Sequence, residues 1–319
     1  MFTPEANLAD IYLQTIQPFW QNQIILGEFI GVGQINIAYA YVVHPEALGS
    51  VVLSAGRIET FLKYKELMYD LYQQGYSVFI HDHRGQGLSG RLTGHPMLGY
   101  VDIFDDYVAD FKLFIDKVVT PNSSHQASLV CHSMGGAIGA LLILAYPSLF
   151  KNVVFSAPMF GIRPALPNWL AHLLLDIHFL QVKFSSTNSA YFWGQSDYEN
   201  VPFAENDLTH SQVRYQLFRQ EYENQPQVKL GGVSGQWLRA AIAAMERVEK
   251  NAEKFPIPAL VMQAGADTVV DNVRQTKVAK KMTNAQFLQI DNAKHELLEE
   301  KDRYRDICLA NILKFIANN

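Results

Sequence analysis

Short apolar runs and longer segments with helical spacing alternate along the first half of the chain. Consecutive apolar residues are typical of strands buried on both faces, whereas apolar residues three and four positions apart are typical of helices with one buried face. The segment at 24–43 reads as two strands joined by a turn. The strand-like runs that follow lie at 50–56, 77–87, 127–132 and 151–158, and the helical segments lie at 59–76 and 101–119. This alternation predicts an α/β fold with a mostly parallel central sheet flanked by helices.

The alternation stops in the middle of the chain. From about 159 to 254 there is no convincing buried strand, and prolines, aromatic residues and helical stripes dominate. The later pattern consists of strands at 256–267 and 285–291 and helices at 271–282 and 301–317. We therefore predict an α/β core in two parts, 1–158 and 255–319, interrupted by a mainly helical cap insertion at 159–254.

Composition narrows the class of protein. Apolar residues make up 49% of the 319 residues and charged residues 18%, which is typical of a globular chain. The formal net charge of -5, without a run of lysine or arginine, argues against a nucleic-acid-binding protein. The two cysteines, Cys131 and Cys308, suit neither a disulfide framework nor a metal site. We expect no metal ion and a reducing compartment.

No segment has the pattern of a membrane span or a secretion signal. The first twenty residues lack the basic start and unbroken apolar stretch of a signal peptide. No window approaches the roughly 18 to 20 apolar residues that span a bilayer. The longest apolar run, 137–146, reads as a buried helix. We expect a cytoplasmic protein, and association with the inner membrane surface stays open.

Candidate chemistry begins at Ser133, in the sequence LVCHSMGGAIGALL. A serine between a buried strand and a helix occupies a sharp turn that lifts its hydroxyl out of the sheet, and small residues must flank such a turn. Gly135 and Gly136 meet this need after the serine, whereas Cys131 stands where this motif usually has glycine. The pattern predicts that Ser133 is a nucleophile, since a strand, serine, two glycines and a helix follow in order.

A nucleophilic serine needs a histidine that takes its proton and an acid that orients the histidine. In α/β folds of this kind the three follow in the chain order serine, acid, histidine, after later strands. Asp267 follows the strand at 256–267, and His295 follows the strand at 285–291. We predict these as acid and base, with Asp271 as the alternative acid. His132, next to the serine, reads as structural.

Acyl transfer also needs hydrogen-bond donors for the oxyanion. One expected donor is the backbone N–H of Met134, directly after the nucleophile. The second is expected in the sequence GRIE after the early strand, where the N–H of Arg57 is the best candidate. The Arg57 side chain itself reads equally well as a solvated surface charge, and Glu59 is expected to brace this loop.

Taken together, GRIE, HDHRGQGLSGR, CHSMGGAI, AGADTVVDN and HELLEEKD resemble the α/β-hydrolase group that contains monoacylglycerol lipases and bacterial lysophospholipases. The cap sequences PFAENDLTHSQVRY and VKLGGVSGQWL are similar to those of the bacterial lysophospholipases. The resemblance runs from about Val51 to the C-terminus. It implies hydrolysis of the single acyl ester of a lysophospholipid at a membrane surface. It also implies a Ser133, Asp267 and His295 triad with oxyanion donors Arg57 and Met134, and no cofactor.

Two alternatives stay open at this point. A monoacylglycerol lipase or general carboxylesterase would use the same residues on a monoacyl lipid or simpler ester. A non-catalytic lipid-binding protein would keep the fold, although the order of the three residues argues against it.

The cap holds further candidates. Among its cations, Arg163, Lys183, Arg214 and Arg219, we select Arg214 as a ligand for the head-group phosphate, against the alternative of a solvated helix face. The segment 166–180 predicts a helix whose apolar stripe includes Trp169 and Leu173. That stripe either packs on the core or covers the entrance over Ser133, holding the acyl chain and touching lipid.

Overall fold

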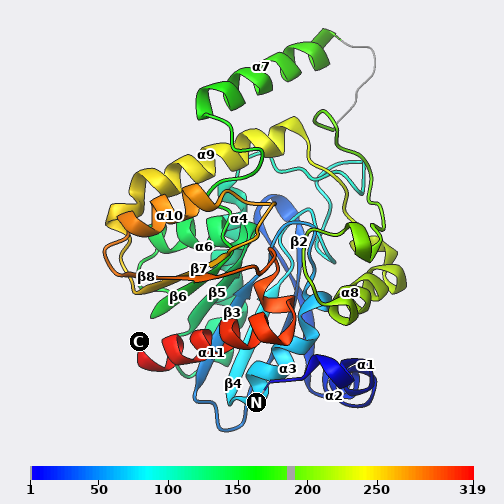
Figure 1. The fold of residues 1–319 in the computed structure, drawn as a ribbon, viewed down its shortest axis with the longest axis vertical. Coiled ribbons are helices and arrows are strands. Elements are labelled where there is room, and N and C mark those ends of the chain that lie inside the picture. The colour runs from blue at the N-terminus through cyan, green and yellow to red at the C-terminus, as the bar shows by residue number, and fades with distance from the viewer. Residues whose placement is uncertain (1, 185–190) are drawn as a thin grey trace.

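The computed structural model describes residues 2–184 and 191–319. Its centre is an eight-stranded sheet in the order β1-β2-β4-β3-β5-β6-β7-β8 (Figure 1). The strands are β1 (Ile25–Ile30), β2 (Asn36–Val42), β3 (Gly49–Ser54), β4 (Tyr76–His81), β5 (Ser128–His132), β6 (Asn152–Ser156), β7 (Ala259–Ala264) and β8 (Ala285–Ile290). β2 pairs antiparallel with β1 and β4, and every pairing from β4 to β8 is parallel. The predicted α/β fold is confirmed.

Both faces of the sheet are covered, because alternate residues of each central strand point to opposite sides. Leu129 and Cys131 of β5 belong to one apolar core, whereas Val130 belongs to the other. The first core includes helices α4 (Asp105–Phe114), α6 (Met134–Ala145) and α10 (Asn272–Lys281). The second includes α3 (Lys65–Gln73) and α11 (Asp302–Asn318) (Figure 1). Because both of its faces are buried, each central strand consists mostly of consecutive apolar residues, and these runs made the strands recognisable in the sequence.

The N-terminal segment forms helices to which we assigned no element from the sequence. α1 (Leu8–Ile11), a π-helical stretch (Tyr12–Ile16) and α2 (Gln17–Gln23) follow one another directly. Leu8, Tyr12 and Ile16 are buried against residues of α8 (Gln212–Asn224). The N-terminal helices therefore pack against α8.

The cap is mainly helical, as predicted, and comprises α7 (Asn168–Phe184), α8 and α9 (Gly235–Asn251); its residues 185–190 lie outside the described residues. α7 lies on α9, at the end of the molecule farthest from α11 (Figure 1). Asp176 and Arg239 join the two helices through an ion pair of 2.7 Å, and His172 contacts Glu246 at 3.0 Å.

The part of the predicted α7 stripe that carries Trp169 and Leu173 faces solvent, whereas Leu174 lines the cavity between α7 and α9. Trp169 is 69% exposed and Leu173 47% exposed, so packing of this stripe on the core is wrong as a prediction. The face turned inward carries Leu175 and His178 instead, and Gly235 of α9 lies so close to the His178 ring that a Cβ there would clash. Within residues 2–184 and 191–319, no helix is long and apolar enough to cross a bilayer.

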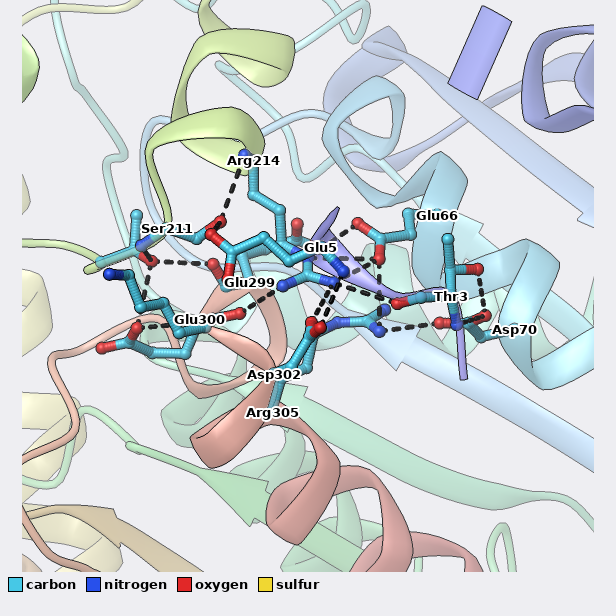
Figure 2. A network of polar contacts seen from close by, with 12 residues as sticks. Thr3, Glu5, Glu66, Asp70, Ser211, Arg214, Glu299, Glu300, Asp302 and Arg305 are labelled. Atoms are coloured by element: carbon cyan, nitrogen blue, oxygen red, sulfur yellow. Dashed lines mark hydrogen bonds and ion pairs between the residues drawn. The ribbon is translucent and has the colours of Figure 1, made fainter. Parts of the chain in front are cut away.

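A buried ionic network joins the N-terminal segment, α3, α8 and the segment that leads into α11 (Figure 2). Arg214 of α8 pairs with Glu66 and Asp302, each at 2.9 Å, and donates to the carbonyls of Glu300 (2.7 Å) and Thr3 (3.2 Å). Arg305 lies beside it and pairs with Asp70 at 2.8 Å. Removal of one member leaves its partners charged and buried, so the network holds α8 firmly to the core.

We expect the substitution Arg214→Ala to lower the free energy of unfolding by about 3–5 kcal/mol, because buried Glu66 would lose the nearer of its two cations and keep only Arg305 at 3.3 Å. Urea unfolding measures this loss. Arg247→Ala is the matched control on α9: Arg247 pairs with Asp105 in solvent, and its loss should change stability by about 1 kcal/mol or less. Equal effects of the two substitutions would contradict the structural role of Arg214.

Candidate active site

Ser133 lies in a strained turn between β5 and α6. Its backbone adopts φ 50° and ψ -118°, which residues other than glycine rarely adopt. A Cβ at position 135 would lie 2.2 Å from the Ser54 carbonyl oxygen, and a Cβ at position 136 would lie 2.6 Å from the Pro158 side chain. The two glycines therefore let α6 begin directly against β3 and the segment after β6, which sets the serine at the end of the sheet.

Cys131 occupies the position where glycine was expected. Its buried side chain points toward Gly139, where an added Cβ would lie 2.5 Å from the Cys131 sulfur. The absence of a side chain at Gly139 thus provides the space that the thiol fills. Burial raises the pKa of Cys131 well above its usual value, so the thiol stays protonated and is a poor nucleophile.

Three side chains from separate loops meet at this turn. His295 Nε2 lies 3.0 Å from Ser133 Oγ, and His295 Nδ1 lies 2.7 Å from a carboxylate oxygen of Asp267. All three residues are buried. β5, β7 and β8 are parallel and end at the same edge of the sheet, which is why loops far apart in sequence converge here.

Asp271, the alternative acid, has a different position. Its carboxylate caps the N-terminus of α10 by accepting from the N–H groups of Val273 (2.9 Å) and Arg274 (3.4 Å). Asp267 is also fixed, because its second oxygen accepts from the N–H groups of Val269 and Val270. Of the two carboxylates, it is Asp267 that contacts His295.

The electrostatics of the pair favour an ionised Asp267 and make His295 more basic than an ordinary histidine. Burial lowers the pKa of His295, but the hydrogen bond and charge of Asp267 outweigh it, so this pKa lies above its ordinary value. Burial raises the pKa of Asp267, but the contact with His295 outweighs this too and holds the pKa below its usual value. The carboxylate therefore accepts the Nδ1 proton and leaves Nε2 to accept from Ser133.

The two expected oxyanion donors flank the serine. Met134 begins α6, and Arg57 lies in the loop directly after β3, which is hydrogen-bonded to β5. Within the described part of the chain, neither backbone N–H has an acceptor. Such free N–H groups are the donors that an oxyanion requires.

A buried ionic cluster that we did not predict lies beneath the site. Lys63 Nζ contacts Glu59 at 2.6 Å and Glu296 at 2.5 Å. Glu59 also accepts a hydrogen bond from the Gly56 N–H, so it braces the loop that carries Arg57, as expected. Glu296 directly follows His295. The ammonium group of Lys63 therefore joins the loop that carries Arg57 to the loop that carries His295. Nothing in the sequence around Lys63 indicated this contact.

His132 completes this cluster and does not contact the serine hydroxyl. Its Nε2 lies 3.7 Å from Glu59 and 3.5 Å from Glu296, and its ring centroid lies 4.8 Å from that of His295, with the two rings tilted by 52°. Glu59, His132 and Glu296 are close enough together to hold a metal ion. The ammonium of Lys63 already supplies the positive charge between the two carboxylates, so these residues do not fit a metal centre.

A cavity of about 570 Å³ opens over Ser133 and His295. Next to it, a second cavity of about 400 Å³ lies between α7 and α9 and is lined mainly by apolar residues, among them Leu166, Leu174 and Leu175. Ile162 and Leu238 line both cavities, so the two adjoin. Together they offer a space of mixed polar and apolar lining at the serine and a more apolar branch between α7 and α9.

The predicted binding residues have different positions. Arg57 lines the first cavity, so a fully solvated side chain is wrong as a prediction. Arg214 lines neither cavity, because its guanidinium is committed to the buried network, and it is not available to a head group. Trp169 and Leu173 also line neither cavity and lie on the outer face of α7; their neighbours Leu174 and Leu175 face the apolar branch.

Comparison with known proteins assigns the family. Residues 45–302 match the hydrolase family described as serine aminopeptidase, S33. The chain is 36% identical to lysophospholipase L2 of Escherichia coli, with 98% of this chain and 93% of that protein covered. The chain belongs to this hydrolase family. The probable lysophospholipase L2 of Haemophilus influenzae is 32% identical, with 95% of each chain covered.

The fold agrees with solved members of the same group. A soluble variant of monoglyceride lipase from Saccharomyces cerevisiae superimposes with a TM-score of 0.69 at 18% identity, covering 92% of this chain and 96% of that one. At this identity the likeness concerns the fold. With the family assignment, it identifies the chain as an α/β-hydrolase enzyme of the ester-hydrolase type.

We expect Asp267→Asn to lower kcat/KM for a short chromogenic ester by about 10⁴-fold, because an amide no longer fixes the His295 tautomer. Asp271→Asn is the control, since asparagine caps a helix as well as aspartate and this carboxylate does not touch His295. Residual Asp267→Asn activity should also have its acid-side inflection at lower pH, because Asp267 raises the pKa of His295. The opposite ranking would assign the acid role to Asp271.

Proposed function

We propose that this enzyme is a lysophospholipase that uses Ser133, His295 and Asp267 as its catalytic triad. The observation that carries the proposal is the continuous hydrogen-bonded chain from the Ser133 hydroxyl through His295 to Asp267, at the floor of a cavity. The similarity to lysophospholipase L2 of Escherichia coli supports the choice of substrate.

Catalysis would follow from this geometry in two steps. Ser133 Oγ attacks the acyl carbonyl while His295 Nε2 takes the hydroxyl proton, and the N–H groups of Met134 and Arg57 stabilise the oxyanion. The glycerophosphodiester leaves with that proton, and the acyl group stays on Ser133. Water then gives a proton to His295 and attacks the acyl-enzyme, which releases the fatty acid. None of these steps requires a metal or organic cofactor.

The two adjoining cavities favour a lipid with one acyl chain. The space between α7 and α9 is the more apolar of the two cavities, and it adjoins the cavity over Ser133 at Ile162 and Leu238. An acyl chain in that branch places the ester at Ser133 and the glycerol in the more polar cavity. A monoacylglycerol would fit the same arrangement, which makes it the alternative substrate.

A substrate panel tests the proposal. Purified enzyme should show a higher kcat/KM for lysophospholipids than for monoacylglycerols and diacyl phospholipids of the same chain length. Ser133→Ala should lower all of these activities by about 10⁴- to 10⁶-fold without loss of thermal stability, because only a hydroxyl is removed. A preference for monoacylglycerol would replace the proposed substrate, and normal turnover by folded Ser133→Ala would reject the triad.

We also propose that the exposed face of α7 binds the lipid surface from which the substrate is taken. Four large apolar residues of this helix are exposed: Trp169, Leu173, Ile177 and Leu180. They recur at helical spacing, while the opposite face of α7 lines the acyl branch. A tryptophan within such a face suits a membrane interface. The helix would thus touch lipid on one side and the acyl chain on the other.

We expect the double substitution Trp169→Ser and Leu173→Ser to weaken vesicle binding and long-chain turnover while sparing a short soluble ester, because both residues lie outside the cavities. Sedimentation with anionic phospholipid vesicles measures the binding. Leu48→Ser with Val273→Ser is the control, since both residues are at least as exposed but lie outside the cap. A general loss of stability and of all activities would show that the α7 face is structural.

A further inference from the structure

Three arginines line the cavity over Ser133 without a carboxylate partner among the described residues: Arg163 is exposed to solvent, whereas Arg57 and Arg219 are partly buried. Arg57 Nη1 donates to the Gly231 carbonyl at 3.0 Å, and its guanidinium lies over the Trp237 ring at 5.5 Å. This is the one hydrogen bond that the Arg57 side chain makes within the described chain, so the rest of its guanidinium is left for another partner. Burial lowers the pKa of Arg57 to about 10, and the group stays charged at neutral pH.

Arg219 of α8 has the same character. It donates to the hydroxyls of Tyr198 and Tyr215, each at 3.0 Å, and its guanidinium lies over the rings of Tyr215 and Phe218 at 4.9 and 5.2 Å. Its Nε is buried with no hydrogen-bond partner in the described structure. Neutral hydroxyls and aromatic rings orient this guanidinium but do not neutralise it.

The fully buried cations among the described residues are paired with acids. Lys63, Lys65, Arg84, Arg214 and Arg305 each contact at least one carboxylate. A cation removed from water without a counter-charge is unfavourable, so proteins rarely retain one for stability alone. Arg57 and Arg219, both unpaired and partly buried in one cavity, therefore indicate that this cavity accepts an anion.

The carboxylates that share this cavity do not fill that role. Glu59 and Glu296 both contact Lys63 and share its single positive charge, and neither forms an ion pair with Arg57 or Arg219 in the described structure. Asp197 and Glu199 are exposed at the rim, where solvent and salt screen their charge. Neither of them forms an ion pair with Arg57 or Arg219 in the described structure.

The position of the two arginines matches the polar end of the substrate. Both line the cavity that holds Ser133 and His295, and neither lines the apolar branch between α7 and α9. Tyr222 connects them: it follows Arg219 on α8, lines the same cavity, and donates to the carbonyl of Ile58, the neighbour of Arg57, at 2.8 Å. A lipid with its acyl chain in the apolar branch would extend its glycerol and head group toward this side.

We propose that Arg57 and Arg219 form an anion subsite that binds the phosphate of the lysophospholipid head group. Guanidinium groups donate two parallel hydrogen bonds to phosphate oxygens and are preoriented for this contact by the rings and hydroxyls around them. The subsite deepens the proposed function and rests on it. It distinguishes a lysophospholipid from a monoacylglycerol, which has no phosphate.

The kinetic test compares palmitoyl lysophosphatidylethanolamine with monopalmitoylglycerol. Arg219→Gln should raise KM for the lysophospholipid roughly tenfold or more and leave KM for the monoacylglycerol within about twofold, because a charged hydrogen bond is lost only in the first case. Arg219→Lys should recover part of the loss. Lys229→Gln is the matched control: Lys229 also lies over the Tyr198 ring and carries a positive charge, but does not line the cavity. Equal effects of Arg219→Gln on both substrates would overturn the subsite.

A binding measurement separates the subsite from the proposed function. Glycerophosphoethanolamine should bind to Ser133→Ala enzyme in calorimetry, and adding Arg219→Gln or Arg57→Gln should abolish that binding; both changes keep the backbone N–H groups. If the subsite recognises a head group, inorganic phosphate should bind more weakly than glycerophosphoethanolamine. Equal binding of the two would show a general phosphate site and would overturn the assignment. If wild-type enzyme cleaves only monoacylglycerol, the proposed function fails, and this measurement still decides the subsite. Unchanged binding by folded double variants would reject it.

Discussion

The strained backbone at Ser133 is the constraint on which the site depends. A non-glycine residue in this conformation is disfavoured by about 1–3 kcal/mol, so the surroundings must enforce it. They do so through backbone contact, because Gly135 and Gly136 bring α6 against β3 and the segment after β6. The result is a hydroxyl raised above the sheet edge and, one residue later, a backbone N–H with no acceptor among the described residues.

Buried charge fixes the loops around that turn. Lys63 joins Glu59, which holds the loop of Arg57, to Glu296, which follows His295. The loop of Arg57 and the loop of His295 are therefore held by the same ammonium group. Movement of either loop away from Lys63 is unfavourable, because the carboxylate of that loop would lose its ion pair.

Two helices of the cap, α8 and α7, are held to the rest of the protein in different ways. α8 is held to the core by the buried network of Arg214, and it presents Arg219 to the cavity. α7 contacts α9 through partly exposed ion pairs and keeps a row of apolar side chains in solvent. The position of α8 accords with the proposed recognition of a head group, and the exposed apolar face of α7 accords with the proposed contact with lipid.

The sequence by itself determined the sheet, its flanking helices and the meeting of Ser133 with His295, and it predicted Asp267 as the third residue with Asp271 as the alternative. It did so because parallel strands buried on both faces leave continuous apolar runs, and because residues that follow such strands converge at one edge of the sheet. The choice of Asp267 over Asp271 needed the structure, since both follow β7 and only the contacts distinguish a helix cap from a partner of His295.

Tertiary structure alone decided which polar residues of the cap face the cavity. Arg214 and Arg219 lie five residues apart on α8, yet one is committed to acids of α3 and α11 and the other is held by tyrosines at the cavity. The apolar stripe of α7 likewise has the period of a packed helix but faces solvent. Periodicity shows which residues of a helix share a face, but segments distant in sequence determine what packs against that face. The same distant segments determine which polar or charged groups contact each arginine.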